Sequence, residues 1–226
     1  MQLLMSGLGA LIMVAICGLT AFFIIAEESR GHGATAAPDE SVGIRATRSQ
    51  LVDARPLSLE EVFPGAEVRP APGEAAYGVG MTHIDTDCDI AATGTLARLL
   101  EENGCTQVVR ANLTAPYGGY EVTAGVFNFT DERDATLIGD QVGRRLASGD
   151  GSFAAMTTLR PGSDPTVQPL SQVGWRSRGH FLLYCVITRP DGQLVPDNDP
   201  DAQRIAVDLV ESYLGGTIIG RRALSP

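Results

Sequence analysis

Two histidines and their polar neighbours are the first candidates for catalysis in this sequence. His83 lies two residues before Asp85, and His180 begins an apolar run close to Trp175 and Arg178. A histidine beside a carboxylate and a hydroxyl or thiol can act as a general base that activates a nucleophile. Because no Gly-x-Ser-x-Gly motif accompanies either histidine, we assign no catalytic residue. We expect structural roles for these side chains. His83, His180, Trp175 and Arg178 are kept as functional candidates.

The second candidate chemistry is that of three cysteines, Cys88, Cys105 and Cys185. A disulfide needs Cα atoms within about 7 Å of each other. A straight helix over residues 89–103 would rise about 22 Å and would hold Cys88 away from Cys105. That pair forms only if the helix begins late, near Gly94. Otherwise Cys185 pairs with one of the two, or is simply a buried apolar side chain.

Two acidic runs begin in the manner of a calcium-binding loop. Each has three aspartates at alternate positions, starting at Asp85 and at Asp197. A calcium loop also needs a glycine at its sixth position and a glutamate at its twelfth, and both runs lack them. The cysteine and histidine spacings of zinc sites, the Gly-x-Gly-x-x-Gly motif and the P-loop motif are also missing from the sequence. We therefore expect no metal and no other cofactor.

An uncharged apolar run lies at the start of the sequence. No side chain from Leu3 to Ala26 carries a charge, and about 20 apolar residues suffice to cross a bilayer core. The run is longer than the apolar region of a cleaved signal, and no positive residue precedes it. We therefore predict a transmembrane helix at residues 1–26, with the lipid bilayer as a partner. Cleavage after Ala36 is the alternative.

Residues 27–57 predict a flexible linker, because they are rich in small and polar residues and contain no aromatic residue. Arginines follow the apolar run, and by themselves they would place the C-terminal domain in the cytoplasm. That rule is weak for a long domain behind a single span. The acidic Glu27 and Glu28, together with the three cysteines, favour the opposite side. We expect the domain to lie outside the cytoplasm, at the cell membrane.

The charge balance argues against a nucleic-acid partner. The sequence has 17 basic residues, all of them arginine, against 27 acidic ones, which gives a formal net charge of −10. A protein of this charge repels a phosphate backbone unless basic residues gather in one stripe. The Arg-Arg pairs at residues 144–145 and 221–222 are isolated. We therefore expect no nucleic-acid partner. The partners that we do expect are a small ligand or another envelope protein.

Residues 58–226 predict an α+β domain with an antiparallel sheet covered by about three helices. The run from His180 to Thr188 lacks polar alternation, which predicts a central strand buried on both faces. From residue 77 to residue 159 the predicted elements follow one another as strand, helix, strand, strand, helix and strand, which is the succession of the ferredoxin-like fold. Other arrangements of the strands in the sheet are compatible with the same succession. Cap residues and hydrophobic spacing predict helices over 89–103, 131–147 and 199–214, the last ended by Gly215-Gly216, and strands over 77–84, 107–114, 120–129, 152–159, 173–176 and 180–188.

Several segments together carry a resemblance. They are Asp87-Cys88 with residues 104–111, residues 122–128, Gly174-Trp175 and residues 178–185. In these segments the chain resembles single-pass, membrane-anchored envelope proteins of high-GC actinobacteria. The resemblance implies a location in the cell envelope and brings no reaction or ligand with it. We therefore expect an extracytoplasmic, non-catalytic binding module, with an envelope hydrolase using His180 or His83 as the alternative.

Overall fold

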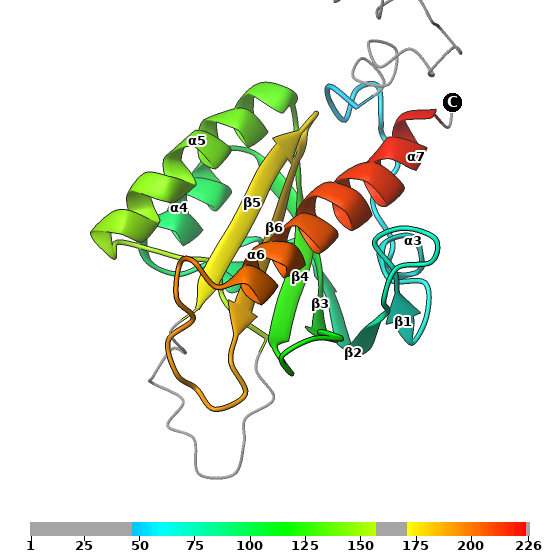
Figure 1. Cartoon of the computed structure of the whole chain (residues 1–226). Helices are drawn as coiled ribbons and strands as arrows, with labels where there is room; N and C mark the ends of the chain where they lie inside the picture. The colour runs from blue at the N-terminus through cyan, green and yellow to red at the C-terminus, as the bar shows by residue number, and fades with distance from the viewer. Residues whose placement is uncertain (1–46, 157–170, 225–226) are drawn as a thin grey trace, which may run out of the picture. The chain divides into compact units, whose positions relative to one another are not determined.

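The computed structural model describes residues 47–156 and 171–224, which form an α+β domain (Figure 1). The predicted transmembrane helix and most of the predicted linker lie outside these residues. Among the helices of residues 47–156 and 171–224, none has the length and apolar character needed to cross a membrane.

A six-stranded antiparallel sheet with the order β1-β2-β3-β4-β6-β5 forms the centre of the domain. Its strands are β1 (Glu67–Val68), β2 (Tyr77–Asp85), β3 (Cys105–Thr114), β4 (Glu121–Phe129), β5 (Gln172–Arg178) and β6 (Phe181–Thr188). The ferredoxin-like order would place β4 between β2 and β3, so that expectation is wrong for this sheet. A disulfide joins Cys88, which follows β2, to Cys105, the first residue of the neighbouring strand β3.

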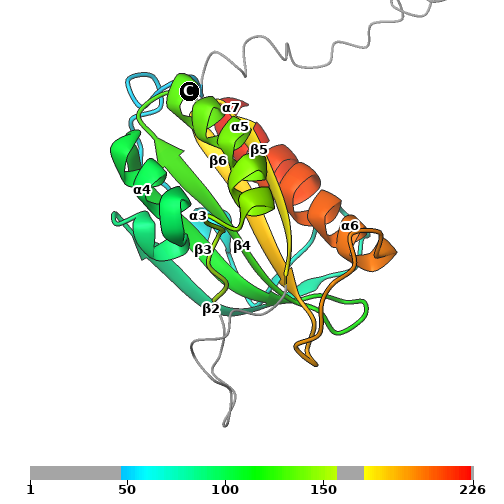
Figure 2. The same cartoon turned by 90° about the vertical axis from the view of Figure 1, so that its left-hand side faces the viewer.

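Helices cover both faces of the sheet (Figures 1 and 2). Buried side chains of α4 and α5 pack on one face, and those of α6 and η2 pack on the other. The helical elements are α3 (Leu59–Val62), η1 (Asp89–Ala91), α4 (Gly94–Glu102), α5 (Glu132–Ser148), α6 (Pro200–Ala206), the π-helix η2 (Val207–Ile219) and α7 (Gly220–Leu224). The domain is thus a sheet between two helical layers.

Strand β6 is the central strand that its sequence predicts. It lies between β4 and β5, and all eight of its residues are buried. Leu182, Tyr184 and Val186 face the α4 and α5 side, whereas Leu183 and Cys185 belong to the core beneath α6 and η2. This alternation between two apolar cores explains why the run contains no polar alternation.

Two predicted elements differ from the structure. The C-terminal helix does not end at Gly215-Gly216 but continues through η2 into α7. Burial of Ile218 and Ile219 stabilises the longer helix, and a side chain of Arg178 binds the carbonyl oxygen of Gly215. Of the predicted strand at 152–159, residues 152–156 make only an isolated bridge, at Phe153. The Phe153 ring lies over the sheet, against Phe127 and Tyr184; residues 157–159 lie outside the described residues.

The folded unit includes residues 47–57, which we expected to belong to the linker. The backbone N–H of Gln50 donates a hydrogen bond to the backbone carbonyl oxygen of Thr130, 3.0 Å away. Leu57 is buried, and both of its backbone polar groups bind the side-chain amide of Gln107 at 3.0 Å. Such specific contacts over 11 consecutive residues fix the segment against the sheet, and the composition of the segment does not reveal them.

Candidate functional site

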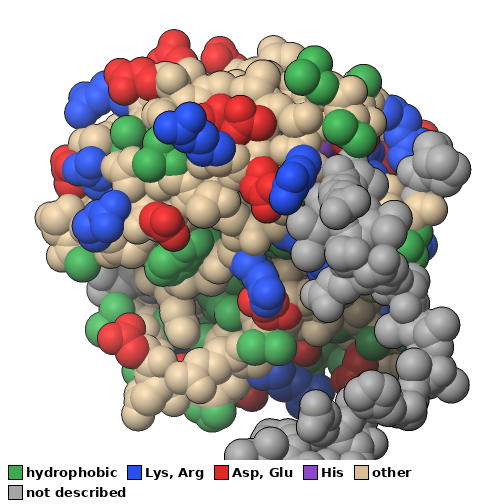
Figure 3. Space-filling view, turned by 90° about the horizontal axis from the view of Figure 1, so that it is seen from above, with side chains coloured by type: hydrophobic (Ala, Val, Ile, Leu, Met, Phe, Trp, Pro, Cys, Tyr) green, Lys and Arg blue, Asp and Glu red, His purple; other side chains and the backbone are tan. Residues whose placement is uncertain are grey.

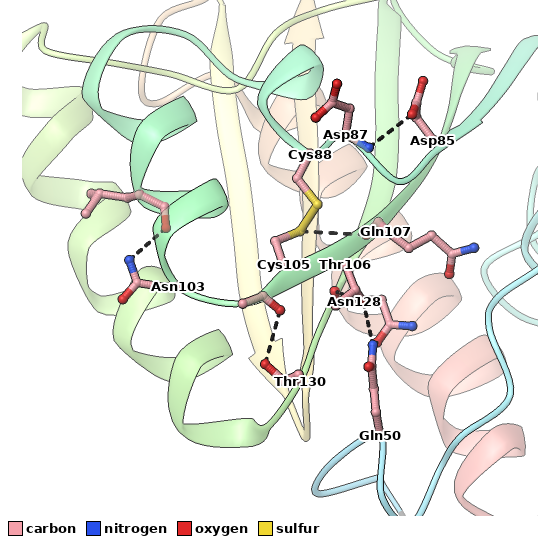
Figure 4. The surroundings of a disulfide bond; sticks show 12 residues. Gln50, Asp85, Asp87, Cys88, Asn103, Cys105, Thr106, Gln107, Asn128 and Thr130 are labelled. Atoms are coloured by element: carbon pink, nitrogen blue, oxygen red, sulfur yellow. Dashed lines mark hydrogen bonds between the residues drawn. A yellow bond between two sulfur atoms is a disulfide. The ribbon is translucent and has the colours of Figure 1, made fainter.

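A disulfide joins Cys88 to Cys105, with their Cα atoms 6.3 Å apart (Figure 4). The pairing is possible because the helix begins at Gly94, after η1, so the two cysteines are not separated by one straight helix. Cys185 is free and buried. Burial raises the pKa of its thiol to about 12, so the thiol is protonated at neutral pH and is a poor nucleophile.

Aspartates of the two acidic runs accept hydrogen bonds from nearby backbone N–H groups. Asp85 accepts a hydrogen bond from the amide of Asp87 at 3.0 Å (Figure 4). Asp199 caps α6 by accepting from the amide of Ala202 at 2.9 Å, and it also accepts from the hydroxyl of Tyr120 at 2.7 Å. In the part of the chain that the structure describes, no three His, Cys, Asp or Glu side chains gather in a way that could hold a metal ion.

His180 is completely buried and fixes the N-terminal segment of the described chain. Its Nδ1 lies 2.7 Å from the carbonyl oxygen of Thr47, and its Nε2 lies 4.0 Å from Oδ2 of Asp53. Burial lowers the pKa of His180, against the opposing effects of the Thr47 carbonyl and the Asp53 carboxylate. A neutral imidazole therefore donates from Nδ1 to Thr47, which is a structural role.

A buried ion network lies beside His180. The guanidinium of Arg222, whose side chain is 2% exposed, binds Asp53 with Nε at 2.5 Å and Glu61 with one terminal nitrogen at 2.8 Å. These bonds join α7 to α3 and to the segment that carries Asp53. The paired charges and well-placed donors of the network stabilise the fold. One terminal nitrogen of Arg222 and Nε2 of His180 stay without a hydrogen-bond partner among the described residues.

Trp175 and Arg178 lie on opposite faces of β5 and do not form one site with His180. The indole of Trp175 donates to the carbonyl oxygen of Gly139 in α5 at 3.0 Å. Arg178 donates to the carbonyl oxygen of Gly215 in η2 at 2.7 Å. Side chains alternate between faces along a strand, so residues 175 and 178 point to different helical layers. Both side chains hold helices against the sheet.

His83 belongs to a row of residues that crosses the sheet on the α4 and α5 side. The register pairs His83 with Arg110, Arg110 with Gly125, Gly125 with Tyr184, and Tyr184 with Trp175. We call His83, Arg110 and Tyr184 the polar row. A Cβ atom on Gly125 would lie 2.8 Å from Cβ of Arg110 and 2.8 Å from Cε1 of Tyr184. The missing side chain of this glycine therefore allows Arg110 and Tyr184 to meet across β4.

The polar row contains three buried polar atoms that have no hydrogen-bond partner among the described residues. They are Nδ1 of His83, Nε of Arg110 and Oη of Tyr184. Burial raises the pKa of Tyr184, and the nearby guanidinium of Arg110 acts in the opposite direction. Nε2 of His83 lies 3.9 Å from Oδ2 of Asp85. An unpaired buried polar atom costs about 1–3 kcal/mol. Four further such atoms of the described residues belong to Arg145, Gln172, His180 and Arg222. The polar row brings three such atoms together across neighbouring strands, which makes it the candidate site.

A second polar cluster, on the other side of the sheet, has its hydrogen bonds satisfied. Asp208 of η2 accepts from the hydroxyl of Tyr77 at 2.8 Å and from that of Tyr117. Arg204 places its guanidinium 4.5 Å from the centre of the Tyr117 ring and its Nε 3.8 Å from Oδ2 of Asp208. These contacts attach η2 to β2, and the pairing of their donors and acceptors indicates a structural role.

Sequence reasoning identified His83 but missed Arg110 and Tyr184. A weak signal exists, because Arg110 is a charged residue inside the apolar strand β3. The register that brings Arg110 to His83 and Tyr184 depends on strand pairing between distant segments, which the sequence does not reveal.

On the face of the molecule seen in Figure 3, acidic and basic side chains are interspersed among the described residues. Comparisons of the chain with models of protein families, with curated proteins and with solved structures found no match.

Proposed function

We propose that this protein is a membrane-anchored, extracytoplasmic module that binds a ligand or another envelope protein without catalysing a reaction. The observation that carries the proposal is the set of unpartnered polar atoms in the polar row. Burying these atoms without hydrogen bonds destabilises the folded domain, and a ligand that forms hydrogen bonds with them offsets that loss. A binding role explains why the row keeps polar groups on a face that otherwise packs against apolar side chains.

The extracytoplasmic location has two supports. Disulfides such as that between Cys88 and Cys105 persist in oxidising compartments and are rare in the cytosol. The uncharged run from Leu3 to Ala26 has the length and composition of a membrane anchor. Together they favour a domain held at the outer side of the membrane.

The hydrolase alternative depends on His83. His180 is buried and its Nδ1 is engaged by the Thr47 carbonyl, so it is placed to hold the fold and not to meet a substrate. The side chain of His83 is 39% exposed and lies near Asp85. No hydroxyl or thiol of residues 47–156 and 171–224 is hydrogen-bonded to His83. A general base without a nucleophile beside it favours binding over hydrolysis.

Protease treatment of intact protoplasts tests the location. When cells that express the full chain are converted to protoplasts, we expect added protease to degrade the folded domain, because the domain faces outward. A cytoplasmic marker protein that stays intact is the control for leakage. Protection of the domain would reverse the proposed orientation. Release of a shortened form that begins near Ala37 would show that the apolar run is a cleaved signal and not a membrane anchor.

A further inference from the structure

We propose that the polar row binds a monoanionic carboxylate group, with Arg110 as its charged partner. This inference rests on the proposed binding function and gives it a ligand chemistry. It does not depend on the side of the membrane on which the domain lies.

The charge of Arg110 has no acidic partner among the described residues. Three of the other partly buried or buried arginines have acidic partners: Arg145 pairs with Asp150 at 3.1 Å, Arg189 pairs with Asp191 at 3.1 Å, and Arg222 pairs with two carboxylates. Arg178 has no acidic partner among the described residues, but its guanidinium binds a backbone carbonyl. The chain has 27 acidic residues against 17 basic ones, so acidic groups are abundant. Arg110 nevertheless has no acidic partner among the described residues, and its Nε is buried. We therefore infer that an anionic ligand neutralises its charge.

The donors of the polar row match an anionic acceptor. A guanidinium offers only hydrogen-bond donors, in a planar fork that fits a carboxylate. The hydroxyl of Tyr184 is an additional donor, and Arg110 lies beside it across Gly125. A carboxylate can accept from the guanidinium and the hydroxyl together, and it neutralises the charge of Arg110.

A carboxylate suits this site better than a phosphate does. Asp85 lies 3.9 Å from the imidazole of His83, so negative charge is already present at the outer end of the row. A dianion would be repelled by that carboxylate more strongly than a monoanion.

The ligand reaches the row from the β2 side of the sheet. Strand β1 pairs with β2 only at Tyr77 and Gly78. Further along β2, Met81 is exposed and His83 is half-buried. The inner end of the row is closed, because Tyr184 is buried beneath the ring of Phe153. A ligand that carries a carboxylate therefore enters beside His83 and presents the carboxylate to Arg110.

Calorimetric titration of the full chain, purified in mild detergent, tests this inference with sodium acetate as the probe. Sodium chloride and sodium phosphate at matched ionic strength are the comparison ions. We expect saturable acetate binding with a millimolar dissociation constant, as befits a ligand of this size, and weaker binding of phosphate. Arg110→Met should weaken acetate binding at least tenfold, and Tyr184→Phe, which keeps the ring, should weaken it several-fold.

Arg98→Met is the matched control, because Arg98 is an exposed arginine on α4, and acetate should bind this variant as it binds the wild type. Circular dichroism establishes that each variant is folded before titration. Absence of saturable acetate binding to the wild type would overturn the inference, as would equal binding to the Arg110→Met and wild-type proteins. Phosphate binding as tight as that of acetate would overturn the assignment of a monoanion. The protoplast experiment reports on location alone, so the two proposals can fail separately.

Discussion

Replacing Arg222 by methionine is expected to lower the free energy of unfolding by about 3 kcal/mol. The substitution keeps an unbranched aliphatic side chain but removes the cation that pairs with Asp53 and Glu61. Both carboxylates are largely buried, so the variant would leave two negative charges close together without a partner. Urea unfolding of the full chain, followed by circular dichroism, measures this loss.

Arg221→Met is the matched control for that measurement. Arg221 precedes Arg222 in α7 and is exposed, and exposed substitutions change stability by about 0.5 kcal/mol or less. If Arg222→Met lost no more stability than this control, the buried network would not hold the N-terminal segment to α7.

Loss of the disulfide is the second large effect that we expect. Cys88 and Cys105 lie 17 positions apart in the sequence, and closing a loop of this length stabilises a protein by about 3 kcal/mol through the restriction of its unfolded chain. The double variant Cys88→Ser, Cys105→Ser should show this loss in urea unfolding. The wild type treated with a reductant should show the same loss.

The double variant also provides the control for the disulfide experiment. Its stability should not change with reductant, because the remaining described cysteine, Cys185, is free and buried. A wild-type protein whose stability is the same with and without reductant would contradict a disulfide that stabilises the fold.

Local features of the fold were predictable where the signal is contained in a few neighbouring residues. Asp131 and Asp199 cap helices, as expected for the first residues of the predicted helices over 131–147 and 199–214. The apolar run of β6 also identifies its central position, because burial on both faces removes the polar alternation of a half-exposed strand.

Features that depend on distant contacts were not predictable. The order of the strands depends on which edges meet, and the same string of elements is compatible with several orders. The helix passes Gly215 because Ile218 and Ile219 are buried further along it, an effect of packing that overrides the stop signal of two glycines. The meeting of Arg110 and Tyr184 depends on register and on the missing side chain at Gly125.

If Arg110 serves a ligand and not the fold, its loss should not destabilise the domain, and the stability of Arg110→Met in the absence of carboxylates tests this claim. Methionine keeps the aliphatic stem and removes a charge that has no acidic partner among the described residues, so the cost of burying that charge disappears. We expect the free energy of unfolding in urea to stay unchanged or to rise by about 1 kcal/mol. A decrease of about 2 kcal/mol or more, similar to the loss expected for Arg222→Met, would contradict the claim, because it would make Arg110 a structural residue.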